Sequence, residues 1–89
     1  MPNVAFTSNL RRHLDCPDRE VTAATVREAL EQVFVETPKL RSYLLDDNGA
    51  VRPHVNIFVD GKLIEDKQQQ SDGVSSKANI YVMQSISGG

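Results

Sequence analysis

The chain lacks several features that would assign it to a well-defined class of protein. It has one cysteine in 89 residues and so no internal disulfide, and we expect a cytoplasmic protein. It has neither a basic leader followed by an apolar run nor a long apolar stretch. We therefore expect no secretory signal and no association with a membrane. Ten basic and twelve acidic residues leave a net charge of −2 without a dense basic cluster, so nucleic acid is not an expected partner.

The chain also lacks the arrangements that carry enzyme chemistry. It has no glycine-rich phosphate loop and no Ser-His-Asp arrangement, so we expect that it is not an enzyme by itself. His13 and His54 are far apart in sequence and have no obvious set of companion ligands, so we expect no bound metal. Cys16 is interpreted as an inert thiol, with a nucleophile activated by His13 as the alternative. Residues 46–49 lack the alternating ligands of a calcium loop and predict a turn.

What the chain does contain fits one small globular domain. Its hydrophobic fraction of 39% and charged fraction of 25% are those of an ordinary folded protein. We expect residues 1–89 to form a single domain with a flexible C-terminal tail at 84–89. A chain of this length buries only about 60–65% of its unfolded surface, so its core must come from a few well-patterned elements.

Helical spacing is clearest after residue 24. Residues 25–28 match a capping box, in which a threonine hydroxyl and a glutamate satisfy backbone N–H groups at the helix start. Thr37 and Pro38 end the helix, because proline disfavours helical geometry in the residue before it. Residues 39–45 predict a second, short helix with Leu40, Tyr43 and Leu44 inward. The inward stripe of the first helix is Val26, Ala29, Leu30, Val33 and Phe34.

Alternation of apolar residues predicts the strands. The longer ones are expected at residues 4–10, 51–60 and 78–83, and shorter antiparallel strands at 19–21 and 62–64. Each of the two shorter strands is joined to the strand before it by residues typical of turns. At Asp60-Gly61 these residues favour a type I′ hairpin. The residues expected on the core face of the longer strands are Val4, Phe6, Val55, Ile57, Val59, Ile80 and Val82.

The order of these elements predicts an α+β roll. A single main helix lying across one face of a mixed sheet of four to five strands can bury that face. The polar stretch at 65–77 is expected to be a surface connection between the last two strands.

The sequence stops at Gly88 and Gly89, shortly after the last predicted strand. Two residues without Cβ atoms can pass through a narrow channel and present a sterically bare carboxylate. Another enzyme can activate such a carboxylate, which a nucleophile then attacks. The pattern predicts a carrier whose own C-terminus is the reactive group, and a chemically idle glycine tail is the alternative.

Together these segments resemble the MoaD/ThiS family of ubiquitin-like sulfur carriers. The matching parts are the opening strand at 4–6, the helix start at 25–30, the hairpin at 55–62, the final strand and the ending at 87–89. The resemblance extends over nearly the whole chain. It implies a ubiquitin-like β-grasp fold.

The resemblance also implies a chemistry. An E1-like enzyme would use ATP to adenylate the carboxylate of Gly89, and a sulfur donor would convert it to a thiocarboxylate. A biosynthetic enzyme would then accept the sulfur, for molybdopterin, thiamin, cysteine or a modified tRNA. Gly88 would provide clearance, and Ser85, Ile86 and Ser87 would occupy the entry channel of the partner. The chain itself would bind no cofactor and be monomeric when free.

Two other functions use the same elements. A ubiquitin-like modifier would join its activated Gly89 to lysine amines of other proteins, and the adenylation step would be identical. A β-grasp interaction module would leave the tail chemically idle, in which case deletion of Gly89 would change nothing.

Phe58, Tyr81 and Met83 form the remaining candidate site. By strand alternation, they point away from the face that the helix covers, close to the tail. An exposed cluster of aromatic and methionine side chains predicts a docking patch for a partner protein. A register shift by one residue would instead place these side chains in the core.

Overall fold

The described part of the chain is built on one mixed sheet. The computed structural model describes residues 1–7 and 18–84. Along them the elements follow the predicted order of strands and helices, with the second short helix directly after the first. The elements are β1 (Asn3–Phe6), β2 (Arg19–Glu20), α2 (Val26–Glu36), α3 (Lys39–Leu44), β3 (Val55–Val59), β4 (Lys62–Leu63) and β5 (Asn79–Gln84).

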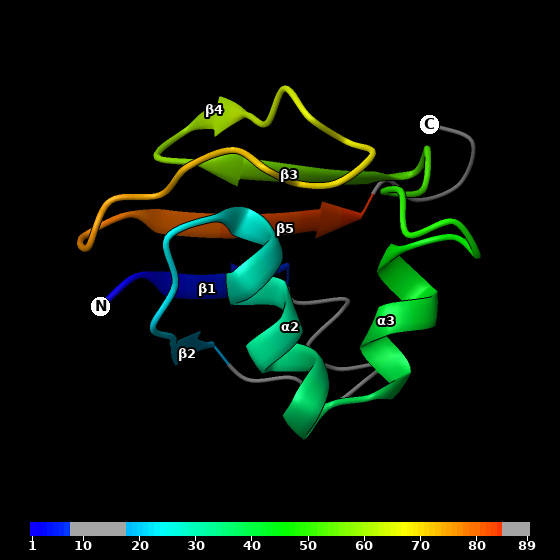
Figure 1. Cartoon of the computed structure of the whole chain (residues 1–89), viewed down its shortest axis with the longest axis horizontal. Coiled ribbons are helices and arrows are strands. Elements are labelled where there is room, and N and C mark those ends of the chain that lie inside the picture. Colours follow the sequence, from blue (N-terminus) through cyan, green and yellow to red (C-terminus); the bar gives the residue numbers. More distant parts are fainter. Residues whose placement is uncertain (8–17, 85–89) are drawn as a thin grey trace.

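The last strand occupies the centre of the sheet. The strand order is β2-β1-β5-β3-β4 (Figure 1). β5 runs parallel to β1 and antiparallel to β3, and the outer pairs β1–β2 and β3–β4 are antiparallel. The first and last strands are therefore neighbours, and β5 has a strand on each side.

β3 begins later than the sequence predicted. It starts at Val55, and Val51 forms only an isolated bridge with Leu45. Between these positions the N–H of Val55 donates to the carbonyl of Arg52 at 3.0 Å and closes a turn that contains Pro53. Proline has no N–H to give to a strand ladder. The strand prediction is therefore wrong for residues 51–54, and of the strand predicted at 4–10, residues 8–10 lie outside the described residues.

The predicted hairpin between β3 and β4 is confirmed. Asp60 and Gly61 have φ values of 51° and 85°. Two consecutive positive φ values define the type I′ turn, which matches the twist of the flanking strands. Val59 then pairs with Lys62, and the N–H of Ile64 donates to the carbonyl of Ile57 at 3.0 Å, just beyond β4.

The capping box of α2 forms with one change. The Thr25 hydroxyl accepts from the N–H of Glu28 at 3.2 Å, as predicted. The Glu28 carboxylate reaches the N–H of Ala24 at 2.7 Å, one residue before the cap. The helix ends at Glu36, and Thr37 is its C-cap.

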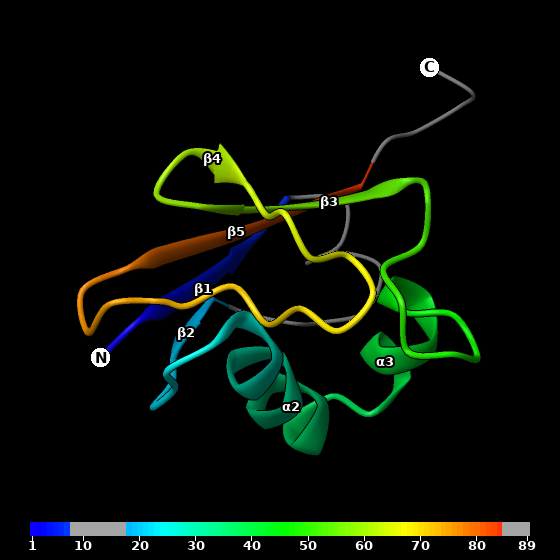
Figure 2. The same cartoon turned by 45° about the horizontal axis from the view of Figure 1, so that its top comes forward.

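Both helices and the connection after β4 pack on one face of the sheet. Figure 2 shows this layer below the sheet. No element within residues 1–7 and 18–84 covers the opposite face. The core between the layers contains all five predicted stripe residues of α2 and six of the seven predicted strand residues, with Val59 half-buried at its margin. Its fully buried members include Val4, Val26, Leu30, Val33, Leu40, Leu44, Val55, Ile57, Ile80 and Val82.

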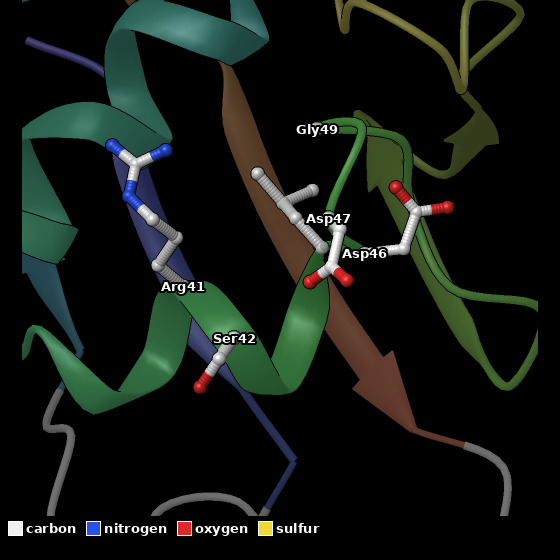
Figure 3. A pocket seen from close by; sticks show the side chains of 6 residues that line it. Arg41, Ser42, Asp46, Asp47 and Gly49 are labelled. Atoms are coloured by element: carbon white, nitrogen blue, oxygen red, sulfur yellow. The ribbon is translucent and has the colours of Figure 1, made fainter.

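The turn at residues 46–49 forms as predicted. The Asp46 carboxylate accepts from the N–H groups of Asn48 at 2.8 Å and Ala50 at 3.1 Å. Gly49 has a φ of 83°, a value at which a side chain would be strained. Figure 3 shows this turn directly after α3.

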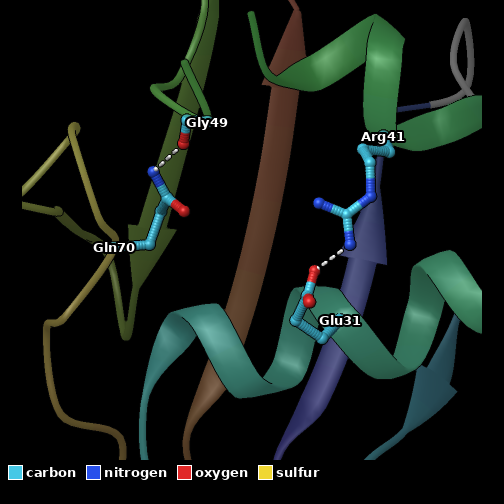
Figure 4. A network of polar contacts seen from close by, with 4 residues as sticks. All are labelled: Glu31, Arg41, Gly49 and Gln70. Atoms are coloured by element: carbon cyan, nitrogen blue, oxygen red, sulfur yellow. Dashed lines mark hydrogen bonds and ion pairs between the residues drawn. The ribbon is translucent and has the colours of Figure 1, made fainter. Parts of the chain in front are cut away.

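The connection at 65–77 departs from the prediction at one residue. Most of it is exposed, as expected, but Gln70 is 1% exposed. Its side-chain amide donates to the carbonyls of Gly49 at 3.1 Å and Lys67 at 2.9 Å, and Figure 4 shows the first of these bonds. The carbonyl of Gln70 also accepts from the N–H of Arg27, at 2.9 Å. One buried residue therefore joins this connection to the 46–49 turn through its side-chain amide and to the start of α2 through its backbone carbonyl.

Candidate functional site

Consecutive residues of β5 point to opposite faces of the sheet. Ile80 and Val82 are 1% and 0% exposed and pack against the helices. Tyr81 is 39% exposed, and Met83 is half-buried. Since side chains alternate along a strand, Tyr81 and Met83 lie on the face that no described helix covers. The central strand thus supplies both the core and an open surface.

The strand register brings apolar residues together on that open face. Phe58 is opposite Tyr81 in β3–β5, Leu63 is opposite Phe58 in β4–β3, and Ala5 is opposite Tyr81 in β1–β5. These four residues form one row across the sheet, and directly opposite side chains have Cβ atoms about 4.5–5.5 Å apart. Met83 is the next residue after Tyr81 on the same face of β5. We call these five residues together the open-face patch.

Leu63 and Ala5 are the members of the open-face patch that sequence reasoning missed. Leu63 is 43% exposed, more than Tyr81. The signal for Leu63 was present in the sequence. A two-residue turn at Asp60-Gly61 pairs Val59 with Lys62, and hence Phe58 with Leu63. The patch therefore extends over four strands of the sheet instead of the two that supplied Phe58, Tyr81 and Met83.

The open-face patch lies close in sequence to the C-terminal glycines. Gln84 follows Met83 and is the last residue of β5, although the predicted tail began at this residue. Five residues separate Gln84 from the end of the printed sequence, and five extended residues span at most about 18 Å. The predicted tail residues Ser85, Ile86, Ser87, Gly88 and Gly89 lie outside the described residues.

α3 contacts the end of β5. The Tyr43 hydroxyl donates to the side-chain oxygen of Gln84 at 3.0 Å in a partly buried position. The ring of Tyr43 meets His54 edge-on, with 6.4 Å between the ring centres. Gln84 is also the register partner of Val55, the first residue of β3. The point from which the chain continues to the glycines is therefore contacted from a helix and from a neighbouring strand.

The described histidine and acidic residues make no metal site. Across residues 1–7 and 18–84, no group of three or more His, Cys, Asp or Glu side chains is close enough to hold an ion. His54 is exposed and contacts Tyr43 instead. His13 and Cys16 lie outside the described residues, so the alternative of an activated cysteine stays a prediction.

A hollow of about 250 Å³ lies beside the end of α3 and offers little for a ligand. Figure 3 shows that its labelled side chains diverge instead of pointing toward one another. Arg41 is engaged in an ion pair with Glu31 (Figure 4) and lies 4.9 Å over the ring of Phe34. The Asp46 carboxylate already accepts two backbone N–H groups. The hollow is lined by Arg41, Ser42, Leu45, Asp46, Asp47 and Gly49.

Asp66 is the described group whose ionisation is clearly perturbed. The Ser71 hydroxyl, 2.5 Å from the carboxylate, lowers the pKa of Asp66 below its ordinary value of 3.8. Backbone N–H groups, that of Gln69 foremost, add to this effect. These bonds fold the connection between β4 and β5, so the shift reflects a structural role.

Neither α2 nor α3, nor any other stretch of the described chain, is a helix long and apolar enough to cross a membrane.

Comparisons with known proteins agree with this geometry. The model of the ThiS family matches residues 9–89 and so includes the C-terminal glycines. A search of the curated proteins finds no match. Among solved structures, the chain is similar to the BexX/CysO complex of Amycolatopsis orientalis, with a TM-score of 0.85, 18% identity and 100% of each chain covered.

Two further structures are similar over almost their full length. SAMP1 from Haloferax volcanii has a TM-score of 0.82 and 20% identity, with 99% of this chain and 98% of that chain covered. Urm1 from Sulfolobus solfataricus has a TM-score of 0.69 and 13% identity, with 93% and 99% covered. At these identities the likeness concerns the fold, which is the predicted ubiquitin-like β-grasp.

Proposed function

The chain belongs to the ThiS family of ubiquitin-like sulfur carriers and modifiers, and we propose that it is a sulfur carrier whose reactive group is the carboxylate of Gly89. An E1-like enzyme would adenylate this carboxylate, with the carboxylate oxygen attacking the α-phosphorus of ATP and pyrophosphate leaving. Sulfide, released by a sulfur donor, would then attack the acyl carbon as HS⁻, displace AMP and lose its proton. The resulting thiocarboxylate would deliver its sulfur to a biosynthetic enzyme.

The observation that carries this proposal is the arrangement along β5. The open-face patch and the start of the glycine-ended segment belong to one strand, with Met83 and Gln84 adjacent. A partner that docks on the patch would therefore receive the following segment within a short, fixed reach of its own active site. That geometry suits a co-substrate, because holding a reactive group near a catalytic centre replaces a bimolecular encounter with an intramolecular one.

The residues would divide the work between them. Phe58, Tyr81 and Met83, with Leu63, would dock the E1-like enzyme, and their exposed apolar area is the kind that protein interfaces use. Gly88 would let the backbone pass the narrow part of the channel, which residues 85–87 would fill. ATP would be bound by the partner, and the chain would supply no catalytic side chain or cofactor of its own.

The likeness to a two-protein complex supports the need for a partner. One of the similar structures is that of BexX with CysO, so a protein of this fold is found there bound to a second protein. For the present chain we propose two partners used in succession, the adenylating enzyme and the sulfur acceptor.

Protein modification is the second candidate function. The similar structures include that of a small archaeal modifier protein, SAMP1. In this version the acyl-adenylate of Gly89 would be attacked, directly or through a thioester, by a lysine amine instead of a sulfur donor. Covalent adducts of the chain in an extract of its host, lost when Gly89 is deleted, would favour modification over sulfur transfer.

The test of the proposed function is the intact mass of the chain. It would be measured before and after incubation with ATP, a sulfide source and the E1-like enzyme of the same host. We expect a gain equal to the mass difference between sulfur and oxygen, and we expect deletion of Gly89 to abolish it. An unchanged mass, with an enzyme shown to be active on another carrier, would contradict the proposal.

A further inference from the structure

The contact between α3 and the end of β5 lies where the glycine-ended segment begins. Figure 1 shows α3 at the end of the sheet at which β5 ends and β3 begins. The Tyr43 hydroxyl reaches Gln84 across 41 positions of sequence, with 3.0 Å between the two oxygens. Tyr43 is half-buried and also packs against the hydrophobic core, so its ring has little freedom to turn away.

From this contact we infer that Tyr43 is a positioning residue for the C-terminal segment. The role rests on the proposed function, because it concerns delivery of Gly89 to the adenylating enzyme. Tyr43 acts through Gln84: its hydroxyl holds the last residue of β5 against the sheet from the helix side. The tether to the reactive carboxylate then starts at Gln84 and not further back along the strand.

The two faces of β5 give this contact its consequence. Tyr81 is exposed and Met83 half-buried, so docking through them would fix the open face of the strand against the partner. The Tyr43 bond fixes the end of the same strand from the other side. If the end of β5 frayed, the tether would lengthen and its terminal carboxylate would sample a larger volume. The effective concentration of that carboxylate at the adenylation centre falls roughly as the −3/2 power of tether length or more steeply.

The His54 contact completes the arrangement. His54 directly precedes β3 and meets the Tyr43 ring edge-on, at an interplanar angle of 81°. The first residue of β3, Val55, is in turn the register partner of Gln84. Tyr43 therefore contacts the end of β5 through its hydroxyl and the residue before β3 through its ring, and the ring contact helps to orient the hydroxyl.

The test replaces Tyr43 with phenylalanine, which keeps the ring and removes the hydroxyl. For Tyr43→Phe we expect adenylation of the enzyme-bound chain to slow by about twofold, the change given by a tether that lengthens from five residues to about eight, with unchanged affinity for the enzyme. The matched control is Ser42→Ala, which removes a hydroxyl from the neighbouring position of α3, where it bonds only within the helix. This control should adenylate at the wild-type rate.

Two further measurements distinguish positioning from a general loss of structure. Gln84→Ala removes the other partner of the bond, so the double variant should be no slower than either single variant. In the free chain, backbone amide exchange at residues 82–84 should be faster in Tyr43→Phe than in Ser42→Ala, while exchange in α2 stays the same.

The outcomes separate this inference from the proposed function. Equal adenylation rates for wild type and Tyr43→Phe, additive effects in the double variant, or unchanged exchange at residues 82–84 would each overturn the role of Tyr43 alone. Failure of the wild-type chain to become adenylated by an active enzyme would overturn the proposed function and this role with it.

Discussion

Ile80 and Tyr81 are neighbours in β5, yet the first is 1% exposed and the second 39%. On the helix side, Ile80 and Val82 pack against aliphatic residues of α2 and α3 in a closed core. On the open side, Tyr81 lies in a row with Phe58 and Leu63 that no described element covers. The two faces of one strand therefore bury very different fractions of their apolar surface.

This difference separates the residues that the core needs from those that it leaves at the surface. Core residues contribute through the area they bury and through close packing, so their identities are set by the neighbours they touch. An apolar row left on the surface contributes less to stability and carries a risk of aggregation. We therefore propose that this row serves recognition of a partner.

The largest effect is expected where neither face is changed. Gly88→Val places a branched side chain in the segment that, under the proposed function, would enter the partner, so adenylation should fall by about 100-fold or more. Thermal stability should stay at the wild-type value, which would separate the glycine-ended segment from both faces. Gly88→Ala, with its smaller side chain, should be impaired less. Adenylation of Gly88→Val at the wild-type rate would contradict the entry of this segment into a narrow channel.

The next prediction compares the two neighbours in β5 directly. Ile80→Ala should lower the free energy of unfolding by about 2–5 kcal/mol, because it leaves a cavity in the closed core. Tyr81→Ala should lower it by about 1 kcal/mol or less, the size of a cross-strand pair. Urea unfolding of both variants would measure the difference. Equal losses would mean that Tyr81 is covered and that the contrast between the faces is false.

A smaller effect is expected for the open face alone. Phe58→Ala should weaken binding to the adenylating enzyme by about tenfold while leaving most of the stability, since Phe58 belongs to the open-face patch. Titration calorimetry would measure the affinity. Val35→Ala is the control, because Val35 is an apolar residue that is 79% exposed but belongs to α2, on the opposite side of the sheet from the patch. A large drop in melting temperature for Phe58→Ala would instead assign this side chain to the core.

The smallest effect is expected away from β5, at Asp66 in the connection after β4. Its pKa is lowered in the folded chain, chiefly by the Ser71 hydroxyl, so the contribution to stability is present above the unfolded pKa and is lost as pH falls through the folded value. Ser71→Ala should therefore raise the pKa of Asp66 toward 3.8, the ordinary value, without changing docking. NMR titration of the carboxyl group would follow this shift. Ser76→Ala, in the same connection, should leave the titration unchanged.

The strongest periodic signals in the sequence predicted most of the fold. The apolar stripe of α2 and the alternation of β5 depend on local spacing, which is visible without any knowledge of the partner elements. The type I′ turn at Asp60-Gly61 is equally local, because both residues tolerate a positive φ. The same local logic failed at residues 51–54, where Pro53 interrupts an apolar run that otherwise resembles a strand.

Features that depend on distant contacts could not be predicted in this way. Gln70 occurs in a polar stretch, and its burial follows from carbonyl acceptors at Gly49 and Lys67 that only the folded chain brings within reach. The bond between Tyr43 and Gln84 joins positions 41 residues apart. Within the candidate site, the direction of Tyr81 followed from alternation, whereas Leu63 required the register of the hairpin to be worked out as well.

The central place of β5 also affects when the protein can fold during synthesis. β1 and β3 do not pair with each other, and each lies beside β5. A nascent chain that has not yet emerged beyond residue 79 would have two strands without their shared neighbour and a core without Ile80 and Val82. Folding as a unit would then wait until β5 has left the ribosome. Truncated products that lack this strand would remain unfolded and be exposed to degradation, so the folded population would be enriched in chains that extend to Gln84 and beyond.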